Sequence, residues 1–421
     1  MANLILSDFS SALKEILLPF IQDNFPKKTI LLDQFKRNAG TDLINDEFVA
    51  PIYTSRHGGV ANLADDNNNI VQAGGRNTSR GTVAVKIISG ALDISKLAID
   101  ASKTNTLAVE NALVAQSKTL ASDFARQVNR QLYSDGVGVV AQVRVTGGSV
   151  GVGTIAIETV QSTIDDTNMT DVYGTINGDI APNKYFAVDQ VIGVGTGGAN
   201  DGTITSVTGT SIVSGAPTAI VSNANDSIYI QDGSGEGAGT AEIVGIRAAL
   251  SSSTGANTYA GVTRDTTGWT PQFGSASEAL TMTRITGSYL SAKETAELDD
   301  KYIILVNQTL YQKYGDILTA MRRTVNEADL LGGWTGLEFA AGAGRVGVFL
   351  DYDVPDGEVL IINLDSWTIT QVSDVNWLED PNGGGLLRKS NTIMFQAVMV
   401  WFANVFCLAP AANGRETRKT N

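Results

Sequence analysis

The chain has 421 residues, a formal net charge of −14 and 43% hydrophobic residues. This length is too great for one ordinary core and predicts two or three domains. The acidic balance argues against a general nucleic-acid binder, because phosphate repels a negatively charged surface. The alternative interpretation is that the charge serves solubility alone.

Cys407 is the single cysteine, which excludes an intrachain disulfide and a cysteine-based metal site. It stands between Phe406 and Leu408, so we expect a buried structural thiol and not a nucleophile. The first residues have no basic segment and reach Asp8 early, so no signal peptide is expected. No apolar run approaches the ~20 residues of a membrane-spanning helix.

The N-terminal quarter predicts a helix, an arm and a hairpin. Residues 7–22 have apolar positions at helical spacing, and Pro19 would kink or end the helix. Residues 24–40 are expected to form an irregular arm with apolar anchors. The strand-like segments 48–53 and 82–88 flank a long polar, glycine-dotted stretch, which predicts an extended hairpin. Such a hairpin could lie across a neighbouring subunit.

The clearest helix is expected over 106–133, where apolar residues recur every three or four positions without Gly or Pro. Gly136 is a suitable stop. From 137 to 245 the texture changes to short Val, Ile and Thr runs between Gly and Asp turns, with few cations. This pattern predicts an inserted β-barrel or sandwich, or alternatively an extra sheet on the main domain.

The next hundred residues are mixed. Helices are predicted at 276–297, with a weak point at Gly287, and at 309–321. Short apolar runs at 303–306 and 346–350 predict buried strands.

The last quarter has a distinctive order. A hydrophobic strand, 359–364, leads into Trp367, and the glycine-rich segment 380–388 follows. One long strand is then expected over 392–406, followed by a proline and a short polar tail.

This order resembles the C-terminal part of major capsid proteins of tailed double-stranded DNA bacteriophages, whose fold is shared with encapsulins. Residues 111–118 look like part of the spine helix of that family. Residues 258–264, followed by Trp269, resemble the entry to its axial domain, and 349–357 the turn before the return strands. The resemblance covers most of the chain except roughly 140–245, and an inserted β-domain is a common variation in the family.

The resemblance implies an α+β fold with an N-arm, an extended loop, a spine helix, peripheral and axial domains, and an inserted all-β domain. The implied division is an N-terminal helix and arm at 1–47, the extended hairpin loop at 48–90, the peripheral domain with the spine helix at 91–139, the inserted domain at 140–245, the axial domain at 246–365, and the peripheral return strands with the C-terminal tail at 366–421.

The implied function is self-assembly into pentamers and hexamers that form an icosahedral head around packaged double-stranded DNA, without sequence-specific binding. An acidic inner wall would suit such a container. The extended loop and N-arm would lock neighbouring capsomers noncovalently. Further implied partners are a portal protein, a decoration protein and a separate scaffolding protein, because the segment before the arm is too short for a fused scaffold. The protein would belong to the virion after assembly in the host cytoplasm, with no membrane partner.

One departure concerns covalent crosslinks, which some family members form through a lysine in the extended loop. Here no lysine lies between Lys36 and Lys86, and the loop carries arginines instead. Arginine stays protonated and cannot be the nucleophile of an isopeptide bond. We therefore expect noncovalent contacts between subunits; the candidate contact residues are Arg56, Arg76, Arg80, Trp334 and Arg388. The alternative is that the loop arginines are merely solvated.

No catalytic, cofactor or metal site is predicted. Gly147–Gly151 matches a nucleophile elbow, but the single histidine, His57, lies upstream of the serine. Gly193–Gly198 matches a dinucleotide-binding pattern, but a turn and strand follow it where a helix is needed. Two other functions are left open: an encapsulin-type nanocompartment shell and a β-rich adhesin or binding protein.

Overall fold

The structure is a computed structural model. It describes residues 29–39, 43–44, 46–53, 59–60, 74–75, 77–96, 106–136, 138–142, 154–156, 186–194, 200–207, 211–214, 227–230, 242–251, 258–264, 269–276, 278–296, 301–320, 327–330, 334–341, 344–355, 357–379, 387–389 and 392–420. The predicted helix at 7–22 lies outside these residues.

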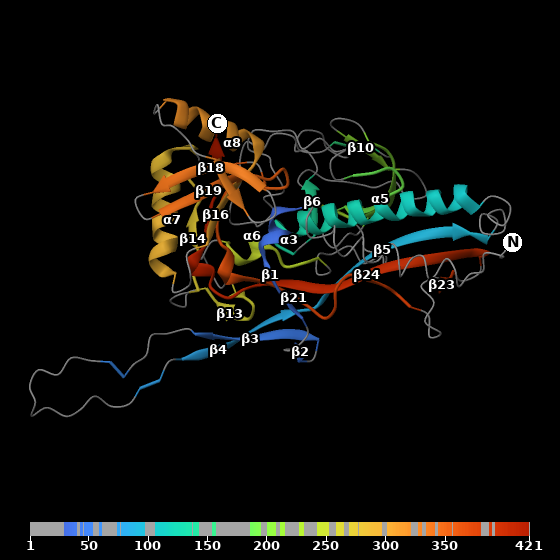
Figure 1. Ribbon diagram of the computed structural model, residues 1–421, viewed down its shortest axis with the longest axis horizontal. Helices are drawn as coiled ribbons and strands as arrows, with labels where there is room; N and C mark the ends of the chain where they lie inside the picture. Colours follow the sequence, from blue (N-terminus) through green and yellow to red (C-terminus); the bar gives the residue numbers. More distant parts are fainter. Residues whose placement is uncertain are drawn as a thin grey trace, which may run out of the picture.

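A long helix beside two long strands forms one side of the molecule (Figure 1). The helix α5 spans Thr106–Leu132, one residue short of the prediction. The strands are β5 (Lys86–Ser95) and β24 (Met394–Cys407), which pair antiparallel from Met394↔Ser95 to Ala403↔Lys86. Gly90 lets α5 come close, since a Cβ there would lie 3.1 Å from Leu120 Cδ1. Trp401 of β24 is buried, as predicted.

Further strands complete this six-stranded sheet. On one side of β24 lies β21 (Trp367–Gln371), followed by β1 (Lys36–Ala39), which runs parallel to β21. The short strands β22 (Asn376–Trp377) and β23 (Leu387–Arg388) also pair with β24. The short helix α3 (Ile30–Gln34) precedes β1. The prediction of an irregular arm over 24–40 was therefore wrong from Ile30 to Ala39, although its apolar anchors are buried as expected.

A seven-stranded sheet with the helices α7 (Met282–Thr295) and α8 (Gln308–Ala320) forms the other main body. Its strand order is β14 (Gln272–Gly274), β25 (Gly414–Glu416), β20 (Val359–Asn363), β16 (Tyr302–Val306), β19 (Gly344–Leu350), β18 (Trp334–Ala341) and β17 (Glu327–Leu330). All residues of β16 and β20 are buried, as expected for strands covered on both faces.

Two predictions about this body were wrong at their ends. The helix expected from 276 begins at Met282, because Thr281 caps it with its side chain and accepts a hydrogen bond from the Arg284 N–H. The residues before it include β15 (Glu278–Ala279), which pairs with β26 (Lys419–Thr420). The expected polar tail is in fact buried, and its strand β25 lies inside the sheet.

The β-rich segment after α5 contributes a second six-stranded sheet. Its order is β6 (Val139–Gln142), β11 (Ser227–Ile230), β8 (Val191–Val194), β9 (Asn200–Val207), β10 (Ser211–Ser214) and β7 (Thr154–Ala156). All its described pairings are antiparallel. Its buried residues belong to the same hydrophobic cluster as those of α5 and β24. The division of the chain at 140–245 stays a prediction.

A narrow three-stranded sheet leaves the body below β21 (Figure 1). It consists of β2 (Leu43–Ile44), β3 (Glu47–Tyr53) and β4 (Thr78–Ala84). The second strand was expected at 82–88, but β4 ends at Ala84. The next strand, β5, belongs to the sheet of β24. We call β3 and β4 the hairpin, and residues 46–52 and 81–85 its root.

Candidate functional site: the hairpin root and the buried polar clusters

The hairpin has little hydrophobic core of its own. Its strands pair from Glu47↔Ala84 to Tyr53↔Thr78. Its buried side chains in the described part are Phe48, Ile52 and Val83, all on strands that enter the root. Only the two-residue strand β2 extends this pair of strands, and a hairpin with so small a sheet is marginally stable in water, so its root contacts with the body contribute to its stability.

The root packs tightly against the end of β24. A Cβ added to Gly81 would overlap the side chain of Ile52 and lie 2.9 Å from Phe406 Cζ. A side chain at position 81 would therefore have to displace Ile52 of the hairpin and Phe406 of the body, and the backbone angle at Gly81 does not itself require glycine.

Asn404 ties the root to two other elements. Its Nδ2 donates to the Ala84 carbonyl at 2.6 Å, at the end of β4. Its Oδ1 accepts from the Val244 N–H at 2.9 Å and from its own neighbour Val405 at 2.8 Å. The side chain is fully buried, so losing it would leave several buried groups without partners.

The three candidate contact residues that the structure describes lie on three different strands. Arg80 is exposed on β4, opposite Pro51. Arg388 is exposed on β23, opposite Phe395, and Trp334 is the first residue of β18. Arg56 and Arg76 lie outside the described residues. Their role between subunits stays a prediction.

A buried ion cluster holds the C-terminal strand. Glu358 accepts from Arg415 Nε at 3.1 Å and from Arg415 NH2 at 2.5 Å, and Arg247 lies 3.4 Å away. Burial alone would raise the pKa of Glu358, but Arg415 and then Arg247 outweigh it and hold that pKa below its ordinary range. All three side chains are buried, so each charge depends on the others.

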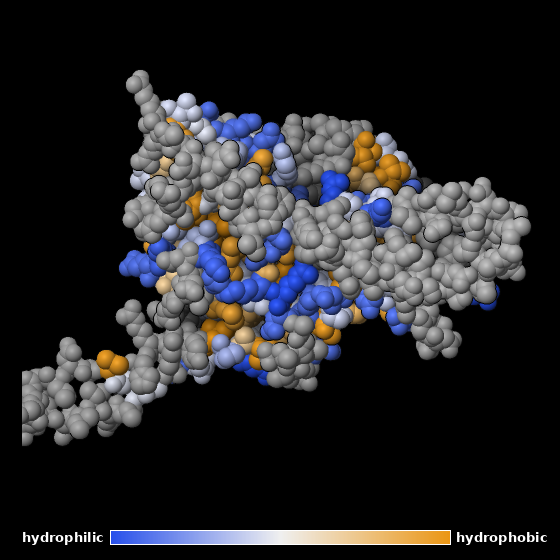
Figure 2. All heavy atoms as spheres, viewed as in Figure 1, coloured by the Kyte–Doolittle hydropathy of each residue, from blue (hydrophilic) through white to orange (hydrophobic). Residues whose placement is uncertain are grey.

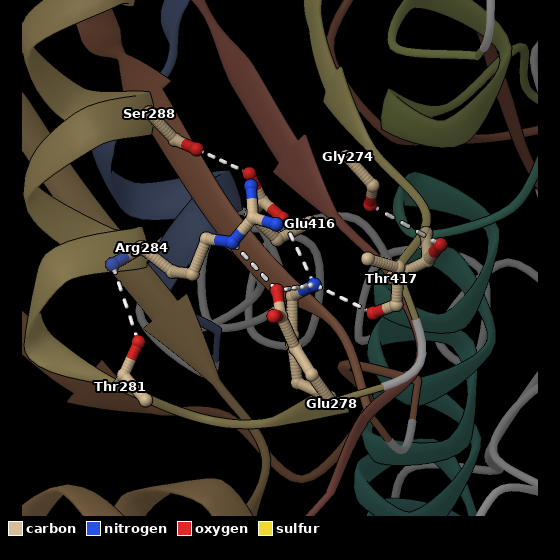
Figure 3. Close-up of polar contacts among 9 residues, drawn as sticks. Gly274, Glu278, Thr281, Arg284, Ser288, Glu416 and Thr417 are labelled. Atoms are coloured by element: carbon tan, nitrogen blue, oxygen red, sulfur yellow. Dashed lines mark hydrogen bonds and ion pairs between the residues drawn. The ribbon is translucent and has the colours of Figure 1, made fainter.

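A second cluster follows at the chain's end (Figure 3). Lys419 Nζ is buried and lies 3.1 Å from Glu278 Oε1 and 3.2 Å from Glu416 Oε2. Glu278 also pairs with Arg284 at 2.6 Å, and Ser288 of α7 donates to Glu416. The hydrogen bond from Lys419 is the main reason that the pKa of Glu278 is lowered. These contacts fix β25 and β26 to β15 and α7.

A third cluster joins α5 to the seven-stranded sheet. The Tyr133 hydroxyl donates to Asp351 Oδ2 at 2.9 Å. Asn129 Nδ2 donates to Asp351 Oδ1 at 3.4 Å and to Asp353 Oδ2 at 2.6 Å. Burial raises the pKa of Asp351 and, together with that carboxylate, raises the pKa of Tyr133 well above its ordinary value. The helix end and the loop after β19 are thereby held together.

Cys407 is the buried structural thiol that was expected. Burial raises its pKa to about 12, so it carries no thiolate at neutral pH. Asn413 Nδ2 lies 3.7 Å from its sulfur, and Asn413 Oδ1 accepts from Trp367 Nε1 at 2.9 Å. The sulfur thus lies among hydrogen-bonded polar side chains where β24 and β21 meet.

The polar contacts of these clusters hold together segments that lie far apart in the sequence. Within the described part of the chain, no group of three or more His, Cys, Asp or Glu residues is arranged to hold a metal ion. In the same part, no helix is long and apolar enough to span a membrane. Sequence reasoning missed Glu358, Arg415 and Lys419, whose partners lie far away along the chain and leave no local signal.

Comparison with known proteins gives similarity at the level of structures. No family model and no curated protein matches the chain. A capsid subunit of cyanophage A-1(L) is 12% identical, with a TM-score of 0.49 and 92% of each chain covered. The capsid of a native GTA particle is 10% identical, with a TM-score of 0.43, covering 92% of this chain and 89% of that one.

A virus-like particle protein from Pyrococcus furiosus is 9% identical, with a TM-score of 0.37, covering 96% of this chain and 98% of that one. The predicted α+β fold class is confirmed by the elements themselves, and the structures to which the chain is similar are capsid and particle proteins of the kind that its sequence resembles.

Proposed function

We propose that the chain is a structural shell subunit that self-assembles and performs no catalysis. The observation that carries this proposal is the hairpin, which is packed against the body at its root and buries three hydrophobic side chains, Phe48, Ile52 and Val83, in its described part. A segment of this kind gains stability when it lies on a surface outside its own chain. A second copy of the chain is the partner that assembly would supply.

The use of the polar residues supports the same proposal. The buried charges have partners within the chain: Arg415 pairs with Glu358, and Lys419 pairs with Glu416. Cys407 is occluded and protonated. On the face shown in Figure 2, hydrophobic residues reach the surface in several places among hydrophilic ones. Exposed ones include Ile87 at 62% and Ile393 at 78%, and contacts between copies would cover such residues.

The finer proposal is the one that the sequence resemblance implies. Pentamers and hexamers would close into an icosahedral head around double-stranded DNA, with a scaffolding protein during assembly and portal and decoration proteins as further partners. The hairpin arginines, Arg80 among them, would pair with carboxylates of a neighbouring copy.

Assembly is tested directly by size-exclusion light scattering and negative-stain electron microscopy of the purified protein. Closed shells, tubes, pentamers or hexamers are the expected result. A monomer that never assembles, even with crowding agent, would overturn the proposal and favour a β-rich binding protein.

The role of Arg80 is tested by charge reversal. Arg80→Glu should leave the unfolding midpoint of the subunit unchanged, because the side chain is exposed, and should reduce the yield of shells. The matched control is Arg80→Lys, which keeps the charge and should assemble. Equal shell yields from Arg80→Glu and wild type would show that this arginine is merely solvated.

A further inference from the structure

A small second hairpin touches the root of the projecting one. It consists of β12 (Thr258–Tyr259) and β13 (Val262–Thr263), which pair as Tyr259↔Val262. The two residues between them, Ala260 and Gly261, have φ angles of 53° and 76°. Positive φ at both central positions is the type I′ geometry, whose twist matches that of the flanking strands.

One side of this turn is anchored through Tyr259. The hydroxyl oxygen of Tyr259 accepts the Cys407 N–H at 2.9 Å. The ring stacks at 6.4 Å from Phe406 and lies 5.8 Å from the Trp269 ring. Trp269 Nε1 donates to the Tyr259 carbonyl at 3.3 Å. Tyr259 is buried, so the turn cannot move without breaking contacts with the end of β24.

The other side is anchored through Arg264. Its guanidinium lies 5.8 Å from the centre of the Tyr259 ring. It donates to the Ala249 carbonyl at 2.6 Å and also to that of Ala248, at the end of the short helix α6 (Ile246–Ala249). Arg264 is 1% exposed, so this attachment is also internal.

The tip of the anchored turn meets the hairpin at Thr82. The Thr82 N–H donates to the Ala260 carbonyl at 3.0 Å. Because this N–H points away from β3, the Val49↔Thr82 pair exchanges no ladder hydrogen bonds, and the bond to Ala260 is an additional one at the outer edge of β4. A Cβ at Gly261 would lie 3.7 Å from Thr82 Oγ1, so the turn also lies beside the Thr82 side chain.

We propose that the Ala260–Gly261 turn is a strut that fixes the angle at which the hairpin leaves the body, with Thr82 as the positioning residue. The role that we assign to this strut rests on the proposed function. Where hairpins lie on neighbouring copies, the angle of each one sets the tilt between subunits and hence the curvature of the shell.

The test removes the strut's hydrogen bond. Thr82→Pro eliminates the N–H donor, and proline is tolerated at the outer edge of a strand. Thr82→Val is the matched control, since it removes the hydroxyl but keeps the N–H. Both are made in a chain labelled at Thr78→Cys, which is exposed at the outer end of β4, and at Asp123→Cys, which is exposed on α5. Cys407 is fully buried and does not compete for the label.

Two readouts separate the strut from the proposed function. In the isolated subunit, the distance distribution between the labels should be single and narrow for wild type and Thr82→Val, and should lose its narrow peak in Thr82→Pro. In assembled material, Thr82→Pro should give particles of several diameters. An unchanged distance distribution in a folded Thr82→Pro subunit would overturn the strut. Narrow distributions without any assembly would retain the strut and overturn the shell function.

A measurement on the wild-type chain tests the strut even if the proline variant misfolds. Residue-resolved hydrogen exchange should show the Thr82 amide protected relative to that of Arg80. The Arg80 amide lies two positions away on the same outer edge and has no hydrogen-bond acceptor among the described residues. Equal exchange at the two amides would mean that the strut does not hold in solution.

Discussion

The hairpin and the C-terminal segment, residues 410–420, both contain short strands, but their surroundings differ. The hairpin keeps three described hydrophobic side chains buried and leaves Arg80 exposed. In the C-terminal segment every residue from 411 to 417 is buried, and Arg415 is paired with Glu358.

The difference shows which interactions belong to the chain and which must come from outside. In the C-terminal segment Arg415 and Lys419 pair with carboxylates of the same chain, and the strands β25 and β26 pair with other strands, so this segment stabilises its own subunit. Among the described residues, the hairpin contacts the body at its root, and under the proposed function a neighbouring copy would stabilise its outer strands. Changes in the first region should therefore act on folding, and changes in the second on assembly.

The largest expected effect on unfolding free energy is at the buried ion cluster of Glu358, Arg415 and Arg247, which we call the C-terminal clamp. Glu358→Gln removes the negative charge between Arg415 and Arg247 and leaves two buried cations together. Breaking a buried ion pair in this way costs about 3–5 kcal/mol of unfolding free energy. Denaturant unfolding of the isolated subunit measures it. Glu294→Gln, on the exposed face of α7, is the control and should change little.

A medium effect is expected at the hairpin root. Gly81→Val forces a branched side chain against Ile52 and Phe406, and overpacking of this kind costs about 1–3 kcal/mol. Gly75→Val is the control, because a Cβ at Gly75 meets nothing within 4 Å. Equal unfolding midpoints for the two variants would show that the root is not tightly packed.

The pH dependence of thermal stability should report on the C-terminal clamp. The folded pKa of Glu358 is lowered, so its stabilisation is complete above the unfolded glutamate pKa of about 4.3 and is lost as the pH falls through the folded value. Thermal midpoints from pH 7 to pH 3 should therefore fall less steeply at the acid end in Glu358→Gln than in wild type. Parallel curves would contradict the role of the clamp.

The smallest effect is a gain. Gly287 lies in α7 and Gly315 in α8, and a Cβ at either meets nothing within 4 Å. Replacing a glycine inside a helix with alanine stabilises by about 1 kcal/mol or less. Gly287→Ala should raise the unfolding midpoint and leave the spread of hairpin distances unchanged. A change in that spread would mean that the body and the hairpin are coupled more widely than through the root.

The sequence predicted the elements whose signal is local. Helix α5 and the strands β16 and β24 carry long or strongly apolar patterns, and each was placed within two residues at both ends. The break at Val85 was missed because β4 and β5 are continuous in strand-forming residues, and only the separate partners β3 and β24 divide them.

The parts that could not be predicted depend on distant partners. The stretch before α7 has helix-forming residues, but Glu278 pairs with Lys419, which lies 141 residues away. Likewise Gly414–Glu416 has the composition of a solvated tail, and only the positions of Glu358 and Gln272 make it a buried strand. The root contacts of Asn404 were invisible for the same reason. The contact residues Arg80, Trp334 and Arg388 concern surfaces between copies and stay predictions.

The position of β25 also constrains the order of events during folding. It lies between β14 and β20, although β14 precedes it by about 140 residues. In the order of synthesis, β14 therefore has no neighbour in its sheet until residue 416 has been made. Closing such a long loop is slow, and the apolar edge of β20 stays uncovered in the meantime. We expect newly made chains to bind chaperones until β25 has inserted, so the supply of subunits is set by this late step.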